Sequence, residues 1–292
     1  MKKKIISVIV GVAGLTMAYF LASGISHIIY NRPTDNAAAE TESTTDSAVQ
    51  GTEEAKSAMT EDEINEMLAG MKTTETAETE TATEEQSEVI PVKFEELQAV
   101  NPVYAWITVP GTDIDYPILQ HASDNSYYLM HNIDGSYGYP GCIYTENMNS
   151  KDFTDNNTVI YGHNMKNGSM FAQLHKFEDP DFFDANREVV IYLPGEVLHY
   201  TIFAAHIYDD RHLLYSFDFT NPEVYQKYLD SIFSTRDMSA NIDKDITVTT
   251  DNQIITLVTC IGSQPNNRLL VQAVLTDREL GAETALAAAA TE

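Results

Sequence analysis

The sequence predicts a mainly β domain, either a barrel or a sandwich, preceded by a transmembrane helix and a disordered acidic linker. Three observations support this prediction: short branched and aromatic runs separated by turn residues, one uncharged apolar run near the N-terminus, and an acidic stretch between them. We divide the 292 residues into a membrane segment at 1–31, a linker at 32–88, a folded domain at 89–280 and a flexible tail at 281–292.

The N-terminal segment has the pattern of a signal-anchor. Lys2, Lys3 and Lys4 precede a run without charged residues at 5–30, and about 20 apolar residues suffice to span a bilayer as a helix. A cleaved secretory signal is the alternative, but its apolar region usually has only about 7–15 residues. Because the lysines stay on the cytoplasmic side, we expect a single-pass protein of the cell membrane with a cytoplasmic N-terminus and an extracellular domain.

The linker is expected to be a disordered spacer. Residues 34–88 hold 16 acidic residues against two lysines, a net charge of −14, which is about half of the formal −27 of the whole chain. The segment otherwise consists mainly of Thr, Ala, Ser and Gln, and it lacks the branched and aromatic residues that could form a core. The strongly negative charge also argues against a nucleic-acid partner, because that polyanion binds to basic surfaces.

The folded domain has the pattern of a barrel or a sandwich. Turn-forming sequences such as VPGTDIDYP and YLPGE recur at short intervals and separate runs of residues that favour strands. We expect strands at 105–109, 114–119, 141–144, 158–161, 189–193, 198–208, 247–249, 254–260 and 269–275.

Three segments of the domain have helical patterns instead. They are the opening FEELQAVN, the later FAQLHKFED, and the segment NPEVYQKYLDSIFST. In the third segment apolar side chains recur at helical spacing, with Asn221 as the N-cap and Pro222 at the first helical position.

The chain contains two cysteines, Cys142 and Cys260, and three interpretations of Cys260 remain open at this level. Outside the cell an even number of cysteines favours a disulfide between them. Alternatively, Cys260 is an inert apolar residue, because it belongs to the buried run IITLVTC. The third interpretation is a nucleophile held at a strand end, because Gly262 and Pro265 break the strand soon after it.

Two further residues lie next to expected strand ends and could act with such a nucleophile. His163 follows the branched run NNTVIY and Gly162, a residue that permits close backbone approach or an unusual dihedral angle. Arg268 begins an apolar run eight positions after Cys260, so a seven-residue loop between antiparallel strands would bring the two to one end. The ordinary alternatives are a surface histidine and a solvated arginine. No Cys-x-x-Cys or His-x-x-His spacing supports a zinc site.

These three residue types form a chemically consistent set. A thiolate attacks an acyl carbon, an imidazole transfers the proton, and a cation stabilises the developing oxyanion. Their spacing in the sequence does not by itself bring them together.

The combined motifs resemble the sortases, which are membrane-anchored cysteine transpeptidases of Gram-positive bacteria. The resemblance rests on TLVTC followed by an arginine at the head of an apolar strand, on the upstream YGHNM, and on the segments FEELQAVNPVYAWITVPGTDIDYPILQ and DNSYYLMHNIDG. The opening helix and the helix before the cysteine strand resemble class B in particular. The resemblance implies a closed, mostly antiparallel β-barrel of about eight strands with peripheral helices.

Carried over residue by residue, the resemblance implies that Cys260 is the nucleophile, His163 the general acid and base, and Arg268 the residue that holds the substrate carbonyl or oxyanion. Three further residues match class B groove positions that contact the sorting motif, namely Asn125, Leu129 and Tyr161. A disulfide with Cys142 is then not expected, because a working nucleophile needs a free thiol.

Two features depart from the class B pattern. Val258 stands where many class B members have serine, and the expected loop at 261–267 is short and carries no acidic residue. Both departures leave the three catalytic positions unchanged and concern the preference for substrate.

The expected reaction is transpeptidation at a C-terminal sorting motif of a secreted protein. Cys260 would form a thioester acyl-enzyme, and an amine of a lipid-linked peptidoglycan precursor would resolve it, without a metal or a cofactor. The membrane anchor would hold the enzyme outside the cell, beside both substrates. One alternative is a hydrolase of the same barrel, in which water resolves the acyl-enzyme, and the other is a non-catalytic, membrane-tethered binding module.

Overall fold

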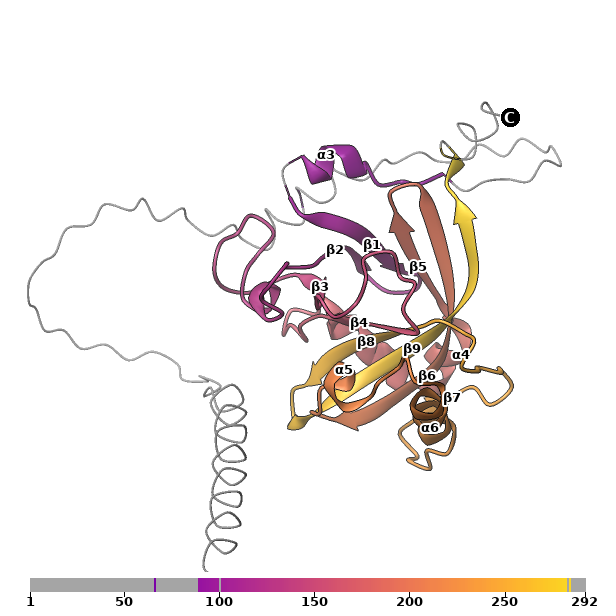
Figure 1. Cartoon of the computed structure of the whole chain (residues 1–292). Coiled ribbons are helices and arrows are strands. Elements are labelled where there is room, and N and C mark those ends of the chain that lie inside the picture. Colours follow the sequence, from indigo (N-terminus) through magenta and orange to yellow (C-terminus); the bar gives the residue numbers. More distant parts are fainter. Residues whose placement is uncertain (1–65, 67–88, 100, 283, 285–292) are drawn as a thin grey trace, which may run out of the picture. The chain divides into compact units, whose positions relative to one another are not determined.

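The computed structural model describes residues 66, 89–99, 101–282 and 284 (Figure 1). The expected membrane segment, the linker apart from Glu66, and most of the expected tail lie outside the described residues. Within the described part of the chain, no helix is both long enough and apolar enough to cross a membrane.

Nine strands and several short helices make up the described part of the chain. The strands are β1 Val103–Val109, β2 Ile114–Leu119, β3 Ile143–Thr145, β4 Asn157–Tyr161, β5 Glu188–Leu193, β6 Glu196–Asp209, β7 Asn241–Ile242, β8 Ile254–Ile261 and β9 Gln264–Leu280. The helices are α3 Phe94–Gln98, α4 Pro180–Ala185, α5 Leu213–Ser216 and α6 Pro222–Phe233, with the 3₁₀ helices η1 Tyr127–Leu129 and η2 Phe171–Glu178.

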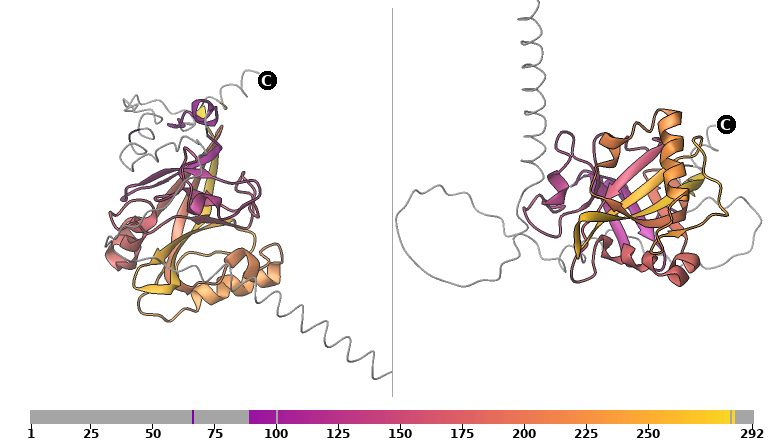
Figure 2. Two further views of the ribbon diagram at one scale, coloured as in Figure 1. Left: turned by 90° about the vertical axis from the view of Figure 1, so that its left-hand side faces the viewer. Right: turned by 90° about the horizontal axis from the view of Figure 1, so that it is seen from below.

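Eight of these strands form a closed barrel, which Figure 2 shows from two further sides. Their order is β5-β1-β2-β3-β4-β8-β9-β6, and pairing between β5 and β6 closes the ring. The short strand β7 pairs with β6 outside the ring. The neighbours β2 and β3 are parallel, as are β4 and β8, and the other pairs are antiparallel. The closed barrel that the resemblance implies is therefore confirmed, and of the two folds that the strand pattern allows, a barrel or a sandwich, the structure has the barrel.

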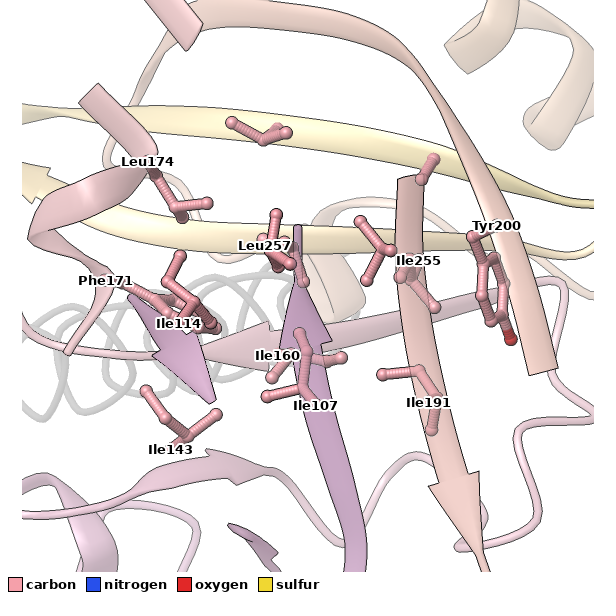
Figure 3. Close-up of a cluster of buried hydrophobic side chains, with 14 of the residues drawn as sticks. Ile107, Ile114, Ile143, Ile160, Phe171, Leu174, Ile191, Tyr200, Ile255 and Leu257 are labelled. Atoms are coloured by element: carbon pink, nitrogen blue, oxygen red, sulfur yellow. The ribbon is translucent and has the colours of Figure 1, made fainter. Parts of the chain in front are cut away.

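Strand β8 lies between the barrel interior and a covering helix, which explains its continuous apolar run. Successive side chains of a strand point to opposite faces. Ile255 and Leu257 point into the barrel, where Figure 3 shows them among side chains from other strands. Ile254 and Val258 belong to a second cluster, which includes Tyr228 and other buried residues of α6. Because both faces are buried, the run does not alternate with polar residues.

Helix α6 begins where the sequence predicts. The Asn221 side chain accepts hydrogen bonds from the backbone N–H groups of Glu223 and Val224, and Pro222 occupies the first helical turn. The cap satisfies backbone donors that have no partner within the helix. The expected helix FAQLHKFED is present as the 3₁₀ helix η2, and FEELQAVN contains α3.

The strand expected at 247–249 is absent. The backbone N–H of Thr249 bonds to the Asn252 side chain, and the backbone N–H of Asn252 bonds to the Thr249 carbonyl, so these residues form a turn. Val248 is nevertheless buried, in the same cluster as the α6 side chains. Burial of one apolar residue therefore produced the strand-like pattern without a strand partner.

Candidate active site

Strands β4 and β8 bring His163 and Cys260 to one level of the barrel. The two strands are parallel, and their last register pair is Tyr161 with Val258. His163 and Cys260 each lie two residues beyond that pair. The backbone N–H of Gly162 also donates to the Val258 carbonyl at 3.1 Å, so the chains remain in contact past the end of β4.

Cys260 and Arg268 lie directly opposite each other in the antiparallel β8–β9 pair. The expected seven-residue loop is wrong, because β8 continues to Ile261 and β9 already begins at Gln264. A register shift directly after Cys260 accommodates the extra residues 265–267 in β9. The prediction that Cys260 and Arg268 are neighbours is confirmed, but a short hairpin with a bulge brings them together in place of the expected loop.

The side chains of Cys260 and Arg268 belong to the outward-facing set of their strands. Val258 and Leu270, each two residues away, are buried outside the barrel in the α6 cluster. Cys260 is exposed, so the side chains of α6 that cover Val258 and Leu270 on this outer face do not extend over Cys260. The thiol is therefore accessible from solvent, whereas its strand is otherwise buried.

The Arg268 guanidinium is held by its own strand. Its Nη1 donates to the carbonyls of Pro265 at 2.9 Å and Asn267 at 2.8 Å. These bonds use Nη1 and leave the N–H groups of Nε and Nη2 for another acceptor.

The His163 ring is oriented by a main-chain carbonyl. Its Nε2 lies 2.7 Å from the Leu129 carbonyl oxygen, which requires a proton on Nε2 and leaves Nδ1 as the basic nitrogen. Burial lowers the pKa of His163, and the bond to Leu129 opposes that effect. The neutral ring is therefore favoured near pH 7. The exposed ring of Tyr139 stands edge-on to the imidazole, with 5.1 Å between the ring centroids.

The three expected groove residues occupy different positions. Leu129 touches His163 through its carbonyl, and its side chain is 40% exposed. Tyr161 ends β4, and its ring stacks on Tyr144 with centroids 5.3 Å apart. The Asn125 side chain accepts the Asn147 backbone N–H at 2.9 Å, which joins the segment before η1 to the loop after β3.

Two polar side chains beside Cys260 were not expected from the sequence. Asn164 Nδ2 donates to the Cys260 carbonyl at 2.9 Å, and His175 Nε2 lies 3.1 Å from the same oxygen. Asn164 directly follows His163, and this proximity was the only sequence signal for it.

Cys142 is a buried free thiol, as the resemblance implies. Both cysteines are unpaired, and Cys142 donates to the His131 carbonyl at 3.3 Å. Burial raises the pKa of Cys142 to about 12, so the thiol is protonated and unreactive. Among the described residues, no three His, Cys, Asp or Glu side chains are grouped as metal ligands would be.

Comparison with known proteins agrees with this geometry. A family model described as a sortase domain matches residues 107–276. The chain belongs to the sortase family. Sortase B of Listeria monocytogenes is 36% identical over 171 residues, which cover 58% of this chain and 67% of that protein. Sortase B of Staphylococcus aureus is 28% identical over 184 residues, which cover 62% of this chain and 73% of that protein.

Solved sortase structures show the same fold. The Clostridium perfringens sortase B structure has a TM-score of 0.58 and 34% identity, covering 63% of this chain and 100% of that one. A B. anthracis sortase B structure has a TM-score of 0.60 and 30% identity, covering 76% of this chain and 100% of that one. The protein is therefore a class B sortase, a cysteine transpeptidase.

Proposed function

We propose that this sortase uses Cys260, His163 and Arg268 to cleave a C-terminal sorting motif of a secreted protein and to join the new C-terminus to an amine of peptidoglycan precursor. The observation that supports the proposal most strongly is the arrangement of the three residues. The parallel register brings His163 level with Cys260 along the strands, and Arg268 is the residue paired with Cys260 in the hairpin.

In the first half of the reaction Cys260 becomes acylated. The sulfur, as thiolate, attacks the carbonyl carbon of the scissile peptide bond, and the carbonyl electrons move onto the oxygen. The Arg268 N–H groups stabilise this oxyanion. His163, having taken the thiol proton on Nδ1, gives it to the leaving nitrogen, so that the C–N bond breaks and a thioester remains.

In the second half an amine releases the enzyme. The amine nitrogen attacks the thioester carbon and transfers a proton to His163, and the C–S bond breaks to regenerate the thiolate. The lowered pKa of His163 suits this step, because the neutral ring is the form that accepts the proton. Water in place of the amine would give hydrolysis by the same steps.

Asn125, Leu129 and Tyr161 are proposed to contact the sorting motif. The Tyr161 hydroxyl is buried and has no hydrogen-bond partner among the described residues. It is therefore a candidate partner for a polar group of the bound peptide, since buried polar atoms are normally paired.

The proposed cellular setting is the outer face of the cell membrane. Lys2 to Lys4 followed by the uncharged run at 5–30 support a single-pass anchor with the catalytic domain outside. A membrane-impermeant thiol reagent should then label Cys260 in intact cells expressing the full chain. Labelling only after lysis would contradict this orientation.

The reaction is tested with the full-length protein, peptides that carry different sorting motifs, and an amine such as oligoglycine or a diaminopimelate derivative. Mass spectrometry should show one motif cleaved and the amine attached, and no reaction for Cys260→Ala. His163→Ala should lower kcat by about 10²- to 10⁴-fold and Arg268→Ala by about 10²- to 10³-fold. Full activity of either variant would refute its proposed role, and product formed only with water would favour the hydrolase.

A further inference from the structure

The carbonyl group of Cys260 lies where the β4–β8 ladder ends. Carbonyls two residues apart in a strand point to the same side, so the Val258 and Cys260 carbonyls both face β4. The Val258 carbonyl accepts the backbone N–H of Gly162, which is the last main-chain bond between these two segments in this direction. Beyond Gly162 a side chain, that of Asn164, donates the hydrogen bond to the Cys260 carbonyl.

Asn164 supplies the replacement bond. Its Nδ2 group lies 2.9 Å from the Cys260 carbonyl and 2.9 Å from His175 Nε2, so its two N–H bonds have one acceptor each. An amide that is bonded at both hydrogens has a fixed orientation, and its oxygen cannot take the place of its nitrogen.

His175 and Glu178 determine how Asn164 is held. The Glu178 carboxylate lies 2.7 Å from His175 Nδ1 and accepts a hydrogen bond from it. With the ring proton on Nδ1, the Nε2 lone pair accepts the second N–H of Asn164, and the 3.1 Å approach of Nε2 to the Cys260 carbonyl oxygen is then a contact without a hydrogen bond. All three side chains are partly exposed or exposed, so the network does not belong to the hydrophobic core.

The same segment also fixes the main chain of His163. The backbone N–H of Phe171, the first residue of η2, donates to the His163 carbonyl at 2.9 Å. Asn164 is the next residue after His163, and His175 lies in η2. The segment at 164–178 therefore donates hydrogen bonds to the main-chain carbonyls of both catalytic residues, from Phe171 to His163 and from Asn164 to Cys260.

We propose that Asn164 and His175 are positioning residues that set the distance between the Cys260 thiol and the His163 ring. Asn164 binds the Cys260 carbonyl directly, and His175 orients Asn164. The inference rests on the proposed roles of Cys260 and His163, but it does not depend on the sorting motif. Neither positioning residue exchanges a proton or forms a covalent bond in the reaction.

The test compares four variants of the full-length protein in detergent. Asn164→Leu keeps a side chain of similar size without the donors, and His175→Leu removes the acceptor for Asn164. His175→Gln retains an acceptor in its amide oxygen and is the conservative rescue. Asn167→Leu is the matched control, because Asn167 lies in the same loop but bonds to Ser169.

Three properties are measured for each variant. The rate of Cys260 alkylation by iodoacetamide is followed by mass spectrometry across pH, with a His163→Ala protein as reference. Steady-state kcat and KM are measured with the cleaved peptide. Thermal unfolding reports the stability of the barrel.

For Asn164→Leu we expect an alkylation profile that matches His163→Ala, a kcat lowered about 10- to 100-fold and a KM within about twofold of the original. His175→Leu should show a smaller change in the same direction, and His175→Gln and Asn167→Leu should show none. If the pH profile of Cys260 alkylation in Asn164→Leu equals that of the unsubstituted protein, the proposal is overturned. So would a loss of kcat in proportion to lost thermal stability, since that indicates a merely structural role.

The alkylation experiment separates this inference from the proposed function. Suppose that the unsubstituted protein cleaves no peptide but that alkylation of its Cys260 depends on His163. The proposed transpeptidation then fails, while the alkylation profile of Asn164→Leu still decides whether Asn164 is a positioning residue. If alkylation of the original protein does not depend on His163, the positioning proposal is refuted. Should Asn164→Leu fail to fold, the difference between His175→Leu and His175→Gln decides the same question.

Discussion

Replacing Gly162 by alanine is expected to disturb the active site by a purely steric effect. A Cβ atom at this position would lie 2.5 Å from Ile143 Cδ1, and 2.6 and 2.7 Å from two ring atoms of Phe171. Ile143 is 1% exposed and Phe171 is fully buried, so neither side chain can move into solvent. Of the two explanations that the sequence allows for this glycine, the structure supports close approach, because Gly162 is not among the positive-φ residues.

The size of the effect follows from these distances. Non-bonded carbon atoms are most stable at about 3.5–4.0 Å, so the neighbours or the backbone must move by about 1 Å. Overpacking of this kind costs about 1–3 kcal/mol of unfolding free energy. His163 is the next residue, and a shift of about 1 Å in a catalytic group can lower the rate about 100-fold.

The assay measures unfolding in urea and kcat on the same protein samples. Gly262→Ala is the matched control, because a Cβ there would meet no atom within 4 Å although it lies in the active-site hairpin. Adding Ile143→Val to Gly162→Ala should restore part of both stability and kcat, since valine lacks the Cδ1 atom that would lie nearest to the new Cβ. If Gly162→Ala and Gly262→Ala give the same stability and the same kcat, the steric argument is wrong.

Three other predictions concern buried groups. Gln272 binds the Tyr228 hydroxyl at 2.8 Å and His206 Nε2 at 3.0 Å, so Gln272→Leu should lower the unfolding free energy by about 2–4 kcal/mol in urea titrations. A loss below about 0.5 kcal/mol would contradict the importance of these bonds. Burial lowers the pKa of His206, so the unfolded state takes up a proton first, near pH 6.5, as the pH falls. The melting temperature should therefore decrease as the pH is lowered from about 7 to 5, and it should decrease less steeply in His206→Gln. Equal dependence of the melting temperature on pH in the two proteins would argue against a role of His206 protonation in unfolding. Iodoacetamide at pH 8 should modify Cys260 in the folded protein and Cys142 only after unfolding, because burial raises the Cys142 pKa to about 12; native labelling of Cys142 would refute its inertness.

Much of the barrel could be predicted from local sequence. Strand β2 has the expected limits, and β8 extends the expected run by one residue, because turn residues flank both runs. The short helices α4 and α5 were missed. Each has only four to six residues, too few for helical periodicity to be visible.

The active site could be predicted only in part, for a different reason. His163, Cys260 and Arg268 were each recognisable as residues at strand ends. Their meeting depends on β4 and β8 being neighbours, and that order around the barrel is a long-range property absent from any local pattern. The Leu129 carbonyl is a main-chain atom, which every residue type provides, so no side chain could identify it.

Strand β9 comes last in the sequence but lies between β8 and β6 in the sheet. Without it the ring would be open next to the strand that carries Cys260. A nascent chain that ends before Arg268 therefore has the thiol but neither the closed ring nor the arginine. During synthesis the nucleophile therefore lacks its full catalytic environment until almost the entire domain has been made. A C-terminal truncation that removes β9 should be far more damaging than the small number of deleted residues suggests.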